Sequence, residues 1–275
     1  MNRILELKQI DEIRKYVEKD VVSHIRTGRV DRFASFDHFD MISFDWIDVE
    51  NSNENSSHTV IYFDKQDLFI LCEKKKCFEA VQKMIPETAS SEKALQAFFV
   101  GIIKNDMDYL DKLEDDITQT EDDLLTSTKM EYSHEIIQYR KELLRLKRYY
   151  EQLISVFDGL TDNENKIISE DTLRQFKILN NRINRLFSTV LNLRDYVTQV
   201  REAYQARIDI EQNNLMKTFT VITSIFLPLT LIAGWYGMNL RMPEYGLKYG
   251  YAIVIGISII VCAACVIFFK RKKWF

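Results

Sequence analysis

The chain has 275 residues, 28% of them charged, a formal net charge of −4 and a mean hydropathy of −0.21. This acidic balance excludes a nucleic-acid binder driven by overall charge, because such binding depends on basic residues that neutralise phosphates. The 8 Gly and 3 Pro predict long helices and few turns. The first residues contain no apolar run typical of a cleaved signal peptide, so we expect the amino terminus in the cytoplasm.

Two stretches near the amino terminus have helical spacing. Residues 1–30 alternate charged and apolar residues and predict a short helix over residues 11–24. Residues 77–103 predict a helix that is interrupted near Pro86, because proline cannot continue the backbone hydrogen bonding.

Strand patterns lie between these helices. Residues 36–49 are aromatic and β-branched and predict one or two strands. The apolar runs 60–63 and 68–71 flank a polar turn and predict a β-hairpin. The expected fold class is therefore α+β, with an α/β cytoplasmic domain over residues 1–103.

The next stretch is strongly acidic, with Lys112 as its one basic residue between residues 106 and 123. A charge run of this kind is usually a solvated helix face. Clustered carboxylates also suit hard cations such as magnesium, so a cation-attracting surface is the second interpretation. The acidic residues are Asp106, Asp108, Asp111, Glu114, Asp115, Asp116, Glu121, Asp122 and Asp123.

Two helices follow. The first is predicted over residues 131–160, with breaks at Asp158-Gly159 and at Asp162-Asn163. The second begins near Ser169 and has a sustained heptad pattern with no Pro or Gly up to residue 227, a length of about 85 Å. A helix this long must pack along partners, and copies from other subunits are among them. Its apolar seam is Phe176, Leu179, Ile183, Leu186, Val190, Leu193, Val197, Val200 and Tyr204.

The end of the chain contains two runs long enough to cross a lipid bilayer. Residues 218–235 are 18 uncharged residues, and residues 251–269 are 19. The second run ends in the basic residues 270–273, which mark the cytoplasmic side. We therefore expect both termini in the cytoplasm and the loop 240–250 outside. The acidic helices and stalk then occupy residues 104–215, and the membrane domain residues 216–275.

One side of the first span alternates oxygen-bearing and apolar residues at steps of three and four. Such a stripe suits a cation pore, where oxygens hold the ion or its water shell and apolar rings form a gate. The hydroxyls can equally bond back to the preceding turn, which would make the stripe a helix-packing surface. The stripe is Asn213, Met216, Thr220, Thr223, Leu227 and Thr230, bordered by Phe219.

The loop after the first span carries a recognisable signature. Tyr236-Gly237-Met238-Asn239, between two terminal apolar runs and after a long heptad helix, resembles the signature of the CorA magnesium transporters. The preceding residues 226–230 and 232–234, and the loop residues Met242-Pro243-Glu244, resemble the family in the same region. Arg241 departs from it, because acidic residues are common there in the family.

The resemblance implies a homopentameric funnel whose first membrane helices line the pore. It implies that Asn239 binds a hydrated magnesium ion at the outer mouth, within a filter formed with Tyr236, Gly237 and Met238. It places Met216 and Phe219 in a hydrophobic gate within the pore lining described above. It also implies regulatory magnesium bound by cytoplasmic carboxylates, for which Glu202 on the stalk is the one candidate.

These features predict a divalent-cation channel for magnesium influx at a plasma membrane, specifically a bacterial inner membrane, with cobalt and nickel as further ions. The alternatives are a zinc transporter of the same superfamily and a membrane-anchored coiled-coil scaffold without transport. We find no phosphate-binding glycine loop, zinc-protease motif or nucleophile elbow, and expect no enzyme. Cys262 and Cys265 have CxxC spacing within an apolar run and are interpreted as packing residues.

Overall fold

The structure is a computed structural model, and the chain divides into two compact units, Met1–Val200 and Arg201–Phe275, which we describe separately. The residues that the structure describes are 2–17, 21–23, 25, 32–49, 56–86, 89–126, 133–238, 248–272 and 274.

The first unit contains a five-stranded sheet in the order β1-β5-β4-β3-β2. The pair β1 and β5 is parallel, and every other neighbouring pair is antiparallel. The predicted hairpin is confirmed as β4–β5, and the Asp64 carboxylate accepts hydrogen bonds from the backbone of Gln66 and Asp67 at its turn. The strands are β1 (Asn2–Glu6), β2 (Phe33–Ser35), β3 (Phe39–Trp46), β4 (Ser57–Asp64) and β5 (Leu68–Cys72).

Helical segments cover both faces of this sheet. The 3-10 helix η1 (Leu7–Lys15) packs its Ile10 and Ile13 against one face. On the other face Phe44 of β3 contacts the rings of Phe98 and Phe99. Those two rings belong to α3 (Ser91–Ile102), which follows α2 (Lys75–Met84) after the predicted interruption at Pro86. Burial on both faces explains why β5 is apolar throughout rather than alternating.

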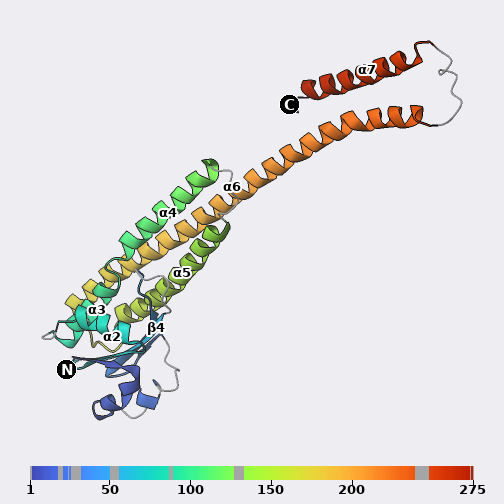
Figure 1. Cartoon of the computed structure of the whole chain (residues 1–275). Helices are drawn as coiled ribbons and strands as arrows, with labels where there is room; N and C mark the ends of the chain where they lie inside the picture. Colours follow the sequence, from blue (N-terminus) through green and yellow to red (C-terminus); the bar gives the residue numbers. More distant parts are fainter. Residues whose placement is uncertain are drawn as a thin grey trace. The chain divides into compact units, whose positions relative to one another are not determined.

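Three long helices complete the first unit: α4 (Asp106–Thr126), α5 (Ser133–Asp162) and the first part of α6 (Glu170–Tyr236). Figure 1 shows α4 and α5 beside this part of α6. Eight of the nine predicted seam residues of α6, from Phe176 to Val200, are buried. Tyr204 is only half-buried, so the buried seam ends where the first unit ends.

The second unit contains the rest of α6 and the helix α7 (Gly250–Arg271). Each holds an 18-residue window long and apolar enough to cross a membrane, with mean hydropathy 1.7 in α6 and 3.0 in α7. Only 6% of each window is buried within the chain. These helices therefore leave most of their apolar surface for lipid or for other protein.

The sequence predictions at the amino terminus were partly wrong. Residues 2–6 form the strand β1 rather than part of a helical pattern, because they pair in parallel with β5 more than sixty residues away. The strand β2 was also missed, since its three residues give no period of their own. The predicted helix over residues 11–24 is replaced by η1 and a few helical residues at 21–23 and 25.

The predicted break at Asp158-Gly159 was also wrong, whereas the one at Asp162-Asn163 is confirmed. Helix α5 continues to Asp162, and Asn163 has a positive φ of 44° that ends the helical path. Gly159 serves packing instead of a turn. A Cβ built on Gly159 would lie 2.1 Å from the nearest ring carbon of Phe33 in β2, so only glycine lets this strand lie against the helix.

We predict that Gly159→Ala destabilises the protein by about 1–3 kcal/mol despite alanine's better helix propensity, because the ring of Phe33 must move. Thermal unfolding followed by circular dichroism measures the effect. Gly256→Ala is the matched control, since this glycine also lies in a helix and a Cβ there would meet nothing within 4 Å in the described part of the chain. Equal or higher stability of Gly159→Ala would contradict this account.

Candidate functional site

One face of the second half of α6 is covered by α7. Val221 is buried on this face, and the Cys265 thiol of α7 donates a hydrogen bond to the Ser224 carbonyl, with a sulfur-oxygen distance of 3.7 Å. Half-buried residues continue the face along α6 at helical spacing. They are Ser224, Ile225, Pro228, Leu229, Ile232 and Tyr236.

The stripe singled out in the sequence lies away from this covered face. All seven of its residues are exposed, and Met216, Phe219 and Leu227 keep 64%, 64% and 66% of their surface accessible. The stripe is therefore available to a neighbouring copy, to lipid or to a lumen. Its members are Asn213, Met216, Phe219, Thr220, Thr223, Leu227 and Thr230.

The threonine hydroxyls of the stripe bond back to the preceding turn. Thr220, Thr223 and Thr230 donate to the carbonyls of the residues four positions earlier, at 2.8, 2.7 and 2.8 Å. The sequence left open whether these hydroxyls bond back or face a lumen, and the two are compatible. Each hydroxyl donates its hydrogen to a backbone carbonyl, so its oxygen can only accept hydrogen bonds from groups outside the helix. That arrangement suits a ligand that donates hydrogen bonds, such as a cation's bound water.

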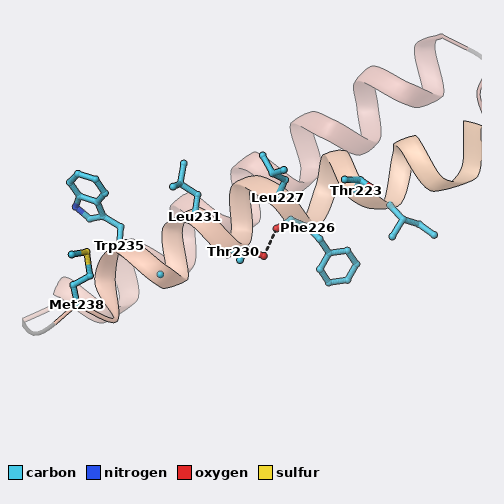
Figure 2. A pocket seen from close by; sticks show the side chains of 9 residues that line it. Thr223, Phe226, Leu227, Thr230, Leu231, Trp235 and Met238 are labelled. Carbon is cyan, nitrogen blue, oxygen red and sulfur yellow. Dashed lines mark hydrogen bonds between the residues drawn. The ribbon is translucent and has the colours of Figure 1, made fainter.

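An open groove of about 820 Å³ runs along the end of α6. Figure 2 shows Leu227, Leu231, Trp235 and Met238 one after another along the helix, and a dashed line from the Thr230 hydroxyl to the Phe226 carbonyl. The groove includes Thr223, Leu227 and Thr230 of the stripe, whereas the other four stripe residues lie outside it. The sequence reasoning missed the apolar members Ile222, Phe226, Leu231 and Trp235. A signal was available, because the apolar residues at 227, 231, 235 and 238 follow one another at steps of four, four and three.

Two glycines near this groove have different roles. A Cβ on Gly234 would meet nothing within 4 Å in the chain, so no contact within the described residues requires glycine there. Gly237 ends the helix by donating its backbone N–H to the Ala233 carbonyl at 2.9 Å. A Cβ on Gly237 would lie 2.9 Å from that same oxygen, so a side chain at this position would disturb the helix end.

Two of the remaining residues of the predicted filter and its loop are among those that the structure describes. Tyr236 is half-buried at the end of α6, and Met238 is 49% exposed. Asn239, Arg241 and Glu244 lie outside the described residues.

The acidic residues of α4 have several roles. Asp106 is buried and accepts a hydrogen bond from the Tyr150 hydroxyl at 2.9 Å, and burial beside Asp106 raises the pKa of Tyr150. Glu121 accepts from the Tyr196 hydroxyl of α6 at 2.6 Å. These two carboxylates hold the helices together. Glu202 is exposed on α6, and among the described residues no group of three or more His, Cys, Asp or Glu is placed to hold a metal ion.

The comparisons with known proteins agree with the fold and the sequence signature. A family model described as CorA-like Mg²⁺ transporter protein matches residues 6–271. The cobalt/magnesium transport protein CorA of Thermotoga maritima is 31% identical over 166 residues, which cover 60% of this chain and 47% of that protein. The chain spans about half the length of the curated relatives that it matches.

Two solved structures share the fold at lower identity. The complete CorA magnesium transporter from Methanocaldococcus jannaschii matches with a TM-score of 0.80 at 20% identity, over 100% of this chain and 90% of that one. The ZntB cytoplasmic domain from Vibrio parahaemolyticus matches with a TM-score of 0.62 at 17% identity, over 76% of this chain and 87% of that one. With a family model that matches nearly its full length, the chain belongs to the CorA-like Mg²⁺ transporter family.

Proposed function

We propose that this chain is one subunit of a channel for divalent cations, with magnesium as the main ion and cobalt and nickel as further ions. The observation that carries the proposal is the exposed stripe of α6, which alternates acceptor oxygens with apolar side chains on the face that α7 leaves free. Family membership and a relative named for cobalt and magnesium transport support the choice of ions.

The two apolar helices found among the described residues cannot enclose a pore by themselves, so the proposal requires several copies. The low burial of both apolar windows fits this requirement. The family resemblance suggests five copies, each contributing its α6 to the lining. In this arrangement Met216 and Phe219 form apolar rings that exclude water when the pore is narrow, and Thr220, Thr223 and Thr230 provide the intervening oxygens.

The filter in this proposal begins at the end of α6 with Tyr236 and continues through Gly237 and Met238, and Asn239 is the residue that meets the ion. Magnesium loses its water reluctantly, so an amide oxygen that accepts from bound water selects the hydrated ion without removing the shell. The loop residue Glu244 adds negative charge at the mouth.

The membrane potential drives influx in this proposal. Inward movement of a divalent ion through about 100 mV lowers its free energy by roughly 4.6 kcal/mol. The protein then sits in the plasma membrane, a bacterial inner membrane, with both termini in the cytoplasm, as the basic residues 270–273 favour. Residues 1–103 and 104–215 form the cytoplasmic part, where magnesium bound near Glu202 regulates opening, and residues 216–275 form the pore.

Two alternatives rest on specific features. Zinc transport is favoured by the fold likeness to the ZntB cytoplasmic domain. A scaffold without transport would explain the long heptad helix but not the oxygen-bearing stripe. Competition among magnesium, cobalt, nickel and zinc in proteoliposome uptake separates these, since zinc preference supports the first and no flux of any ion supports the second.

The filter assignment predicts that Asn239→Ala lowers magnesium flux in proteoliposomes by about tenfold or more, a barrier change of roughly 1.4 kcal/mol. The loss follows because alanine cannot accept a hydrogen bond from the ion's water shell. Asn214→Ala is the matched control, the same change on α6 outside the stripe. Wild-type flux in Asn239→Ala would overturn the assignment of the filter.

The stripe predicts that Thr223→Val and Thr230→Val each reduce flux by about two- to fivefold, the scale of one hydrogen bond. Valine keeps the shape of threonine but removes the acceptor oxygen. Thr218→Val provides a close control, because Thr218 makes the same backward bond, to Asn214 at 3.0 Å, from another side of the helix. If all three variants behave alike, the stripe does not line the ion path.

Charges on the first unit suggest how the copies meet. A groove of about 290 Å³ between α5 and α6 is lined by Arg140, Lys141 and Arg194 with Ile137 and Leu144, and these three cations make no ion pair with the described residues. Helix α4 carries three exposed aspartates at helical spacing, Asp108, Asp111 and Asp115. They also make no ion pair within the part of the chain that the structure describes. An acidic surface and a basic groove on one subunit favour head-to-tail contacts, which form a ring where the rotation between copies closes.

We predict that the double variant Lys141→Glu, Arg194→Glu weakens the oligomer, and that adding Asp111→Lys and Asp115→Lys restores it through the reversed pair. Light scattering of the purified protein at physiological salt measures the mass. Arg174→Glu with Lys177→Glu reverses two exposed cations of α6 outside the groove and controls for net charge. An unchanged mass in the groove variant would exclude this contact.

A further inference from the structure

Helix α6 contains a proline in the middle of its apolar part, and this proline leaves one carbonyl without its helical partner. In a helix each N–H bonds to the carbonyl four residues earlier. Pro228 has no N–H, so the Ser224 carbonyl cannot receive the bond that this position normally supplies. The helix nevertheless continues through Pro228 to Tyr236.

An unpaired carbonyl is costly in the hydrocarbon of a membrane, because no water is present to replace the lost bond. Membrane helices tolerate proline where a neighbouring helix or a side chain provides a substitute donor. Ser224 is half-buried on the face that α7 covers, so a substitute donor for its carbonyl has to come from the protein.

Helix α7 supplies that donor. The Cys265 thiol donates to the Ser224 carbonyl at 3.7 Å, within the range of a hydrogen bond to or from sulfur. Ser258, also on α7, donates its hydroxyl to Val254 of its own helix at 2.9 Å. Cys262, one turn before Cys265 and equally half-buried, makes no hydrogen bond with the described residues. The two cysteines that look alike in sequence therefore have different roles.

We propose that Cys265 is a positioning residue that completes the backbone hydrogen bonding of α6 at Pro228 and ties α7 to the pore helix there. Pro228 lies between Thr223 and Thr230 of the proposed pore, so the bond holds the backbone between these two oxygen-bearing residues of the stripe. Any change in the bend of α6 at this turn therefore acts on the hydrogen bond between Cys265 and the Ser224 carbonyl. The stabilising role stands by itself, whereas the consequence for ion flow rests on the function proposed above.

The first test compares donor capacity with size. Cys265→Val fills the site but cannot donate, and Cys265→Ser is smaller but keeps a donor. We expect Cys265→Val and Cys265→Ala to lower the Tm of the detergent-purified protein by about 2–4 °C. Cys265→Ser should retain most of the stabilisation that the thiol provides. Cys262→Val is the matched control and should change Tm little. If serine costs as much as alanine, or valine costs nothing, the thiol acts by packing and the proposal is wrong.

The second test restores the missing N–H. In Pro228→Ala the new backbone N–H bonds to the Ser224 carbonyl, so Cys265→Ala should cost nothing further in this background. Equal losses in both backgrounds would overturn the proposal.

Magnesium flux in proteoliposomes then measures the functional consequence. We expect Cys265→Ala to change flux in the parent protein but not in the Pro228→Ala background. If the parent chain conducts no divalent cation while the Tm coupling persists, the proposed function fails and the role of Cys265 stands. If flux is normal and the Tm values are simply additive, the role of Cys265 fails and the channel stands.

Discussion

Hydrocarbon offers no hydrogen bonds, and this constraint organises the second unit of the chain. Every polar group on α6 has to be satisfied by the helix or by its neighbours. The threonines of the stripe achieve this by bonding to their own preceding turn, and the carbonyl freed by Pro228 receives the thiol of Cys265. What is left exposed on the free face is a row of acceptor oxygens and apolar side chains. The two such helices found among the described residues cannot cover that face by themselves, which is the physical reason for proposing an assembly around a shared pore.

The first unit depends on a different interaction, the apolar seam of α6. Its residues from Phe176 to Val200 are buried, and the Phe176 ring lies 5.9 Å from that of Phe157 in α5 and 6.3 Å from that of Phe99 in α3, measured between ring centroids. Tyrosine hydroxyls on carboxylates add specific links, as between Tyr196 and Glu121. The same α4 that makes these links presents acidic side chains outward. One helix can therefore hold its own subunit together and face another.

Long-range periodicity explains which features could be predicted. The heptad of α6, both apolar helices and the hairpin follow from spacing along the chain, and all are confirmed. Strand β1 could not be found this way, because its partner β5 is distant in sequence and its own residues alternate weakly. Gly159 was misread because glycine usually ends helices, whereas here the close approach of Phe33 requires it. The apolar residues of the groove, such as Trp235, could not be assigned to an exposed face from the sequence, because their exposure depends on which face of α6 is covered by α7. The role of Asn239 stays a prediction from the signature.

We propose that the face of α6 opposite α7 lines a water-filled path. Single cysteines placed along residues 213–230, in a background with the four native cysteines replaced by serine, test it directly by their reaction with a charged, membrane-impermeant thiol reagent in proteoliposomes. We expect rapid reaction of cysteines at positions 220, 223, 227 and 230, little reaction at 221, 225 and 229, and protection of the reactive positions by magnesium. Uniform reactivity around the helix, or reaction on the α7 face alone, would contradict it.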